Sequence, residues 1–68
     1  MAILKVIEVL ANSKTSWEDA TRTAVKRASK SVKNIRSVYV NEQSAVVDAK
    51  GKITEFRVNV KITFQVGS

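Results

Sequence analysis

The carboxylates have the widest chemical range in this chain, because a carboxylate can act as an acid, a base, a nucleophile or a metal ligand. The sequence contains no His and no Cys, which excludes a Ser-His-Asp triad, a Cys nucleophile, disulfides and the commonest zinc sites. A calcium site would have to be assembled from loops, carbonyl groups or neighbouring subunits, because no run of residues resembles an EF-hand. The carboxylates are scattered as Glu8, Glu18, Asp19, Glu42, Asp48 and Glu55.

Composition excludes further classes of protein. Two glycines and no Pro leave no room for a Gly-rich loop that cradles phosphate. No apolar run approaches the roughly 18 residues of a membrane span. The start, Met-Ala-Ile-Leu-Lys, lacks the basic region and the small-residue cleavage site of a signal peptide. We therefore predict a cytoplasmic protein that is not an enzyme.

Two kinds of periodicity predict the first two elements. Residues 3 to 11 are rich in Val and Ile on both faces, which is typical of a strand buried on both sides. Residues 15 to 34 have a helical period, and Thr15 with Glu18 predicts a capping box at the helix start. We expect Trp17 to pack rather than to bind a ligand, because it lies on the apolar helix face. That face carries Trp17, Ala20, Ala24, Val25, Ala28 and Val32.

Residues 35 to 66 predict a β-hairpin. Its turn lies at residues 48 to 52, where Gly51 supplies the positive φ that a tight turn often requires. The second strand alternates between apolar and polar residues, and its apolar face, from Phe56 to Val66, is predicted to lie on the helix. Its polar face carries Glu55, Arg57, Asn59, Lys61, Thr63 and Gln65.

The elements predict an α+β fold. A single domain spans residues 1 to 68, with the order β-α-β-β and a three-stranded antiparallel sheet packed on one helix. The long last strand is expected to lie between the other two. A core this small supplies roughly 3–5 kcal/mol by itself. With disulfides excluded, self-association is the remaining source of stability, and we predict a homo-oligomer.

The cations on the polar face of the last strand have two interpretations. Arg57 and Lys61 form ion pairs with Glu42 or Glu55 across a contact between subunits, or they hold an anionic ligand such as a nucleotide-like phosphate. Ion pairing is the commoner outcome, because buried charges nearly always have partners.

The order and length of the elements resemble the dodecins, small β-α-β-β proteins that assemble as hollow twelve-subunit shells. The resemblance covers essentially the whole chain and rests on the segments "KVIEVLANS", "SWEDATRTAVKRASKSVKNI" and "GKITEFRVNVKITF". It implies a non-catalytic homo-dodecamer in which neighbouring subunits cover the outer face of the sheet. It also implies that a small ligand is bound and sequestered at the subunit contacts.

The ligand of the family is flavin, held by a Trp of the second strand that stacks on the ring and a Gln of the third strand. Counting back without gaps from "EFRV" places the Trp position at Val38 and the Gln position at Arg57. Val offers no flat face for stacking, and Tyr39 is expected to point the other way. The resemblance therefore implies that flavin binding is weak or lost.

The segments "TSWE" and "NEQ...VVDAKGKIT" resemble a branch of the family that lacks this Trp and includes calcium-binding dodecins. A calcium-binding, ion-binding or purely structural dodecamer is therefore the alternative. A second alternative is a basic protein that binds nucleic acid without specificity, since the net charge is +6. The cationic helix stripe also fits an ordinary solvated face; it consists of Arg22, Lys26, Lys30 and Lys33.

Overall fold

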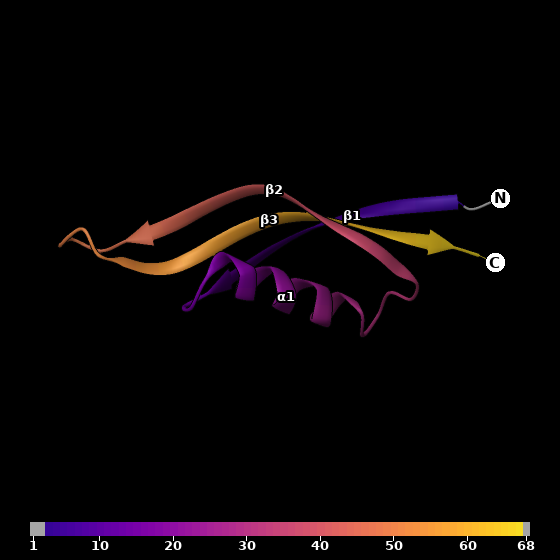
Figure 1. The fold of residues 1–68 in the computed structure, drawn as a ribbon, viewed down its shortest axis with the longest axis horizontal. Coiled ribbons are helices and arrows are strands. Elements are labelled where there is room, and N and C mark those ends of the chain that lie inside the picture. Colours follow the sequence, from indigo (N-terminus) through magenta and orange to yellow (C-terminus); the bar gives the residue numbers. More distant parts are fainter. Residues whose placement is uncertain (1–2, 68) are drawn as a thin grey trace.

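The chain folds into three strands and one helix in the predicted order. The computed structural model describes residues 3–67. Strand β3 is the middle strand of the order β1-β3-β2 and is antiparallel to both neighbours. Helix α1 covers one face of the sheet (Figure 1), which confirms the predicted fold class. The elements are β1 (Ile3–Ser13), α1 (Trp17–Ala28), β2 (Ile35–Val47) and β3 (Ile53–Val66).

The core lies between β3 and the helix. Val60 and Ile62 are fully buried, and Val58 is 2% exposed. They pack against Ala20 and Ala24 of α1, whose small side chains let the helix approach the sheet. Burying each of the three β3 side chains is worth roughly 1.5–3 kcal/mol. The apolar face of the last strand therefore lies on the helix, as predicted.

The helix begins one residue later than the predicted capping box implies. Its N-cap is Ser16, in extended conformation, and the Ser16 hydroxyl accepts a hydrogen bond from the Asp19 amide. The predicted capping box of Thr15 and Glu18 is therefore wrong, and Glu18 instead pairs with Arg22. The Ser13 hydroxyl accepts hydrogen bonds from the amides of Thr15 and Ser16 and donates to the Asp19 carboxylate at 2.7 Å.

The helix also ends earlier than residue 34. After Ala28 the chain forms turns, and the Ser29 hydroxyl donates to the Lys26 carbonyl at 2.7 Å. Such local bonds from Ser compete with the helical pattern. Asn34 then adopts a left-handed φ of 62°, which redirects the chain into β2 and which Asn tolerates better than most residues. Helical periodicity alone did not reveal these turn residues.

The hairpin between β2 and β3 closes through the predicted turn. Gly51 has a φ of 81°, and its amide donates to the Asp48 carbonyl at 3.0 Å. One carboxylate oxygen of Asp48 also accepts from the amides of Lys50 and Lys52, at 2.8 and 3.0 Å. This pattern is an Asx turn in which the side chain holds the backbone.

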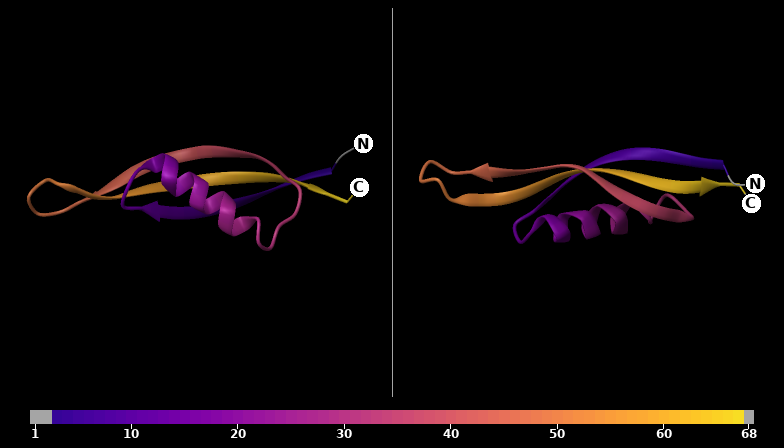
Figure 2. Two further views of the ribbon diagram at one scale, coloured as in Figure 1. Left: turned by 60° about the horizontal axis from the view of Figure 1, so that its bottom comes forward. Right: turned by 45° about the horizontal axis from the view of Figure 1, so that its top comes forward.

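The subunit is elongated. Its extents are 53 × 19 × 13 Å and its radius of gyration is 14.0 Å, against about 11 Å for a compact chain of this length. The β2–β3 hairpin extends beyond the helix, as both views of Figure 2 show. Within residues 3–67, the helix is too short and too polar to cross a membrane.

Replacing Gly51 with Ala tests the turn. An added Cβ would meet nothing within 4 Å, so the cost comes from the left-handed backbone alone. We expect the free energy of unfolding to fall by about 1 kcal/mol, measured by denaturant titration at fixed protein concentration. Lys50→Ala in the same turn is the control and should change little. Equal stability of G51A and the parent chain would contradict this account of the turn.

Candidate ligand site on the open face of the sheet

The face of the sheet that points away from α1 is called the open face. Because Val58, Val60 and Ile62 point toward the helix, the alternate residues of β3 point away from it. Residues paired across strands share a face, so the register identifies the whole surface. Its central rows run from β1 through β3 to β2 as Glu8–Lys61–Tyr39, Leu10–Asn59–Glu42 and Asn12–Arg57–Ser44.

Two of these rows form a groove. It has a volume of about 570 Å³, within the usual range of small-molecule sites, about 300–1,000 Å³. Its lining combines amide, carboxylate, hydroxyl and guanidinium groups beside one large apolar side chain. The residues of this open-face groove are Leu10, Asn12, Glu42, Gln43, Ser44, Arg57, Val58 and Asn59.

Asn59 lies at the centre of the open-face groove. Its side-chain oxygen Oδ1 is buried and has no hydrogen-bond partner among residues 3–67. A buried polar atom without a partner costs roughly 1–3 kcal/mol, and such atoms are rare in proteins. Asn59 therefore has one amide oxygen without a partner beneath the surface of the open-face groove.

Irregularities in β2 decide which of its residues reach the open face. The pairing with β3 shifts between Ile35 and Ser37 and again between Val40 and Glu42. Each bulge adds one residue and reverses the alternation that follows it. Glu42 therefore lies on the open face, although strict alternation from Tyr39 would place it on the helix face.

The structure does not bring Val38 and Arg57 together. Val38 pairs with Ile62 and packs against the helix-side core, whereas Arg57 lies on the open face between Asn12 and Ser44. The ungapped count that reached Val38 runs past the bulge before Glu42, so the equivalence of Val38 and Arg57 to the family's Trp and Gln positions stays a prediction. The neighbouring residue Ser37 is the one that lies on the open face, opposite Thr63.

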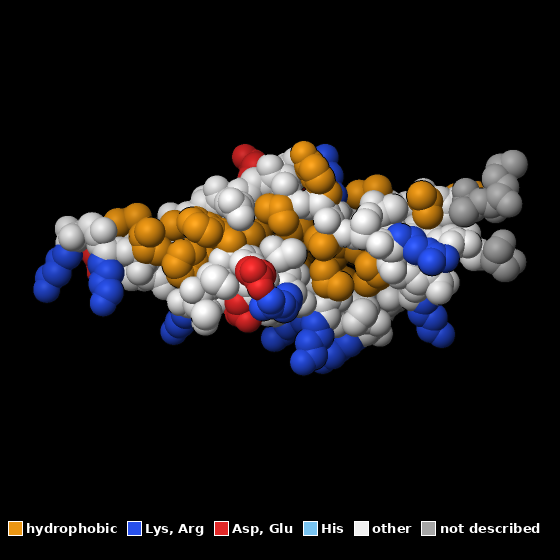
Figure 3. All heavy atoms as spheres, in the orientation of Figure 1, with side chains coloured by type: hydrophobic (Ala, Val, Ile, Leu, Met, Phe, Trp, Pro, Cys, Tyr) orange, Lys and Arg blue, Asp and Glu red, His pale blue; other side chains and the backbone are white. Residues whose placement is uncertain are grey.

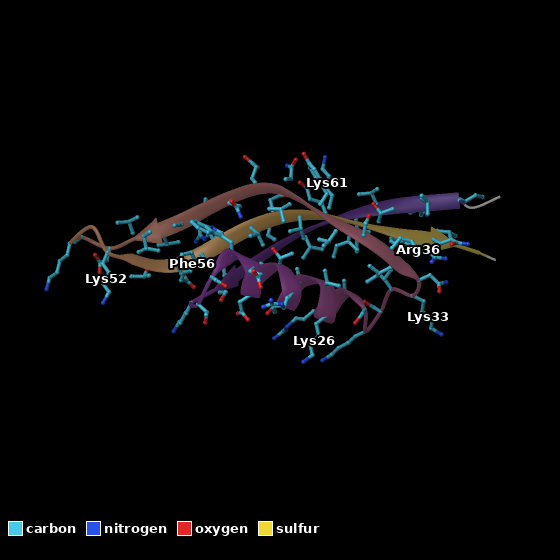
Figure 4. All side chains as sticks on the ribbon, in the orientation of Figure 1. Lys26, Lys33, Arg36, Lys52, Phe56 and Lys61 are labelled. Atoms are coloured by element: carbon cyan, nitrogen blue, oxygen red, sulfur yellow. The ribbon has the colours of Figure 1, made fainter. Side chains whose placement is uncertain are left out.

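The four residues predicted for ion pairs between subunits do share the open face. Lys61 is paired with Glu8 of β1, and Glu55 lies beside Val46 of β2. Figure 4 shows Lys61 on the side of the sheet away from the helix. The one ion pair found among residues 3–67 joins Arg22 and Glu18 on the helix. Pairing of Arg57, Lys61, Glu42 and Glu55 between subunits therefore stays a prediction.

Trp17 is a packing residue, as expected. Its ring meets Phe56 edge-to-face, with centroids 5.0 Å apart, and its Nε1 donates to the Ser44 carbonyl at 2.8 Å. These contacts tie the helix start to the hairpin. Phe56 lies between the sheet and the helix in Figure 4. Sequence reasoning did not single out two other groove residues. Asn59 is part of the polar alternation of β3, and Asn12 lies at the end of β1.

The groove offers hard oxygen donors with little negative charge. Glu42 is its one carboxylate, and the Arg57 guanidinium lies in the adjacent row. Residues 3–67 contain no group of three Asp or Glu side chains that could hold a metal ion. Calcium takes six to eight oxygen ligands. The groove of one chain therefore holds too few oxygen donors to complete a calcium shell.

Hydrophobic side chains surround the groove and continue around the sheet. On the open face Leu10 is 76% exposed, Val6 56% and Leu4 55%. Figure 3 shows a further band of hydrophobic side chains between β2 and α1. Contiguous exposed apolar surface of this kind marks an interaction site in soluble proteins.

The fold and the groove together define a small α+β protein with an uncovered, partly apolar sheet face. The family described as Dodecin matches residues 3–67, and the chain belongs to this family. A relative named calcium dodecin, from Mycobacterium tuberculosis, is 44% identical over 66 residues, which cover 97% of this chain and 92% of the relative.

Solved structures agree with this assignment. The structure of the Mycobacterium tuberculosis calcium dodecin, described as calcium-chelating with a novel calcium-binding site, has a TM-score of 0.81 and 42% identity, covering 96% of this chain and 91% of that one. The dodecin of Streptomyces davaonensis has a TM-score of 0.90 at 22% identity, covering 98% and 97%. A mutant Thermus thermophilus dodecin has the same score and identity with full coverage of both chains. The last two likenesses concern the fold alone.

Proposed function

We propose that this dodecin is a non-catalytic binding protein that assembles into a twelve-subunit shell and sequesters a small ligand at the subunit contacts. The open-face groove is the ligand site. The observation that carries the proposal is the open-face groove, a hollow of about 570 Å³ beside an edge strand that exposes Leu4, Val6 and Leu10. Neighbouring subunits would cover these apolar side chains and enclose the groove.

Self-association also follows from the energetics of the open face. Covering an exposed Leu or Val side chain is worth roughly 1.5–3 kcal/mol. Leu4, Val6 and Leu10 are each more than half exposed, so covering all three would be worth roughly 3–6 kcal/mol of burial free energy. Contacts between copies of the chain would therefore add a term comparable to the net stability expected of a core this small, roughly 3–5 kcal/mol.

Leu10→Glu tests the assembly. The parent chain is expected to sediment at about 90 kDa, which is twelve copies of the 7.5 kDa chain. Leu10 is 76% exposed in the single chain, so a carboxylate there is harmless to one subunit but costly when a neighbour buries it. We expect L10E to lose the 90 kDa species in analytical ultracentrifugation. Lys26→Gln changes the charge equally on the helix and should keep it; an intact 90 kDa L10E would disprove burial of the open face.

Calcium is the ligand that the relatives and the donor set favour. The 44% identical relative is named calcium dodecin, and Glu42, Asn12 and Asn59 supply hard oxygens in one groove. Since one chain supplies too little negative charge, the ion would be shared between copies. This requirement links metal binding to assembly.

Removing one carboxylate tests calcium binding. A calcium concentration of 100 times the dissociation constant should stabilise the native assembly by about 2.7 kcal/mol per site, seen as a rise in melting temperature that a chelator reverses. Glu42→Gln should remove most of this rise. Glu18→Gln, on the helix, is the matched control and should keep it. A full calcium response in E42Q would place the ion outside the open-face groove.

Flavin is the ligand of the family that the sequence resembles, but the groove gives little support for flavin binding. Stacking needs a flat aromatic face, and none of the groove residues is aromatic. Tyr39, 65% exposed, lies two rows away from Arg57 on the open face. Weak or absent flavin binding therefore remains the prediction. The prediction of nonspecific nucleic-acid binding still rests on the net charge alone, and the groove adds no support for it.

An introduced Trp distinguishes the two faces of β2. Ser44→Trp combined with Arg57→Gln is expected to raise riboflavin affinity by about tenfold, since positions 44 and 57 share one row of the open face and an aromatic contact is worth up to about 1.5 kcal/mol. The control is Val38→Trp with Arg57→Gln, whose ring would enter the helix-side core. We expect no gain in riboflavin affinity, and overpacking should lower the free energy of unfolding by roughly 1–3 kcal/mol. Quenching of riboflavin fluorescence reports both. Tighter binding by the Val38 variant would show that the assignment of faces is wrong.

A further inference from the structure

A second groove runs along the edge of the sheet, between β1 and α1. It has a volume of about 520 Å³ and is called the edge groove. Ile7 and Val9 of β1 form one wall, and Ala24 and Ala28 of α1 form the other. Figure 2, left, shows that α1 crosses the sheet at an angle and ends over β1. The edge groove exists because β1 has no strand on its outer side and the facing helix residues are small.

One end of the edge groove is strongly cationic. Arg27 lines it and also lines an adjoining hollow with Thr23, Lys26 and Lys30. The acidic residues of α1, Glu18 and Asp19, lie in its first turn at the opposite end. Figure 4 places Lys26 on the far side of the helix from the sheet. Arg27 thus borders the apolar groove, and Lys26 and Lys30 lie beside it on the adjoining outer surface.

The helix dipole does not account for this charge. A helix C-terminus carries about half an elementary negative charge, whereas Lys26, Arg27 and Lys30 carry three positive ones. The one ion pair among residues 3–67 uses Arg22 and Glu18, so these three cations gain no carboxylate partner within that part of the chain. A substantial positive potential therefore remains where the apolar channel ends.

We propose that the edge groove binds a single-chain amphiphile with an anionic head group, of the fatty-acid or alkyl-phosphate class. The alkyl chain lies on Ile7, Val9, Ala24 and Ala28, and the head group binds Arg27 with Lys26 and Lys30. The β1 wall from Ile7 to Ala11 is about 13 Å long at 3.3 Å per residue, which suits a medium-length alkyl chain. A small inorganic anion would leave the apolar walls in water, and a neutral lipid would leave the cations without a partner.

The edge groove is separate from the open-face groove. The two share Leu10 and Asn12 because β1 is the edge strand between them. Arg27 belongs to the edge groove alone, whereas Arg57 belongs to the open-face groove alone. Substitutions of these two arginines therefore distinguish the sites, whether or not the open-face groove binds calcium.

Titration calorimetry of the native assembly with octanoate, decanoate and dodecanoate below their micelle concentrations tests the proposal. Affinity is expected to rise about fourfold per added methylene, which corresponds to about 0.8 kcal/mol per buried CH₂, and to level off when the groove is full. Decanol, which lacks charge, should bind at least tenfold more weakly than decanoate. Comparing decanoate with decyl phosphate shows which head group the cations prefer.

Arginine variants locate the site. Arg27→Gln should weaken decanoate binding about tenfold. Arg22→Gln removes the same charge from the same helix outside the groove, and Arg57→Gln removes it from the open face; both should keep the parent affinity. The proposal would be overturned if affinity did not change with alkyl chain length, if R22Q and R27Q lost decanoate affinity equally, or if the assembly bound no decanoate. The last outcome would indicate that a second subunit covers the edge groove.

Discussion

The arrangement of this protein depends on one geometric constraint: a single helix covers one face of a three-stranded sheet and leaves the other face open. This arrangement leaves apolar side chains exposed, which is unfavourable in water. Strand β1 places Ile7 and Val9 beneath the helix but Leu4, Val6 and Leu10 on the uncovered side. Among residues 3–67 no second element covers them. The assembly that we propose would bury them.

The position of the polar residues at the centre of the open face follows from the same constraint. Strand β3 lies in the centre of the sheet, so its alternate residues sit at the middle of the uncovered face. Arg57 thereby lies between Asn12 and Ser44, and Asn59 lies between Leu10 and Glu42. Such a groove suits a ligand that completes its shell from more than one subunit. The same edge strand that borders this groove also forms the wall of a separate, apolar groove against the helix.

Much of the fold was predictable from residue periodicity. The alternation from Phe56 to Val66 indicated a strand with one buried face, and Gly51 indicated the turn before it. The ends of the helix were less predictable, because Ser16, Ser29 and Asn34 act through local hydrogen bonds and backbone angles that a 3.6-residue period does not contain. The site was predictable only in part. Arg57 and Glu42 do lie together in the groove, whereas Val38 lies in the helix-side core.

The sequence alone determined the element order, the dodecin resemblance and the lack of His and Cys chemistry, since these depend on residue types and short-range patterns. The tertiary structure decided which residues of β2 share a face with β3, and therefore which side chains form the groove. The physical reason is that a strand has a period of two, so one bulged residue exchanges its faces. No local pattern in the sequence reveals a bulge whose position is set by pairing with another strand.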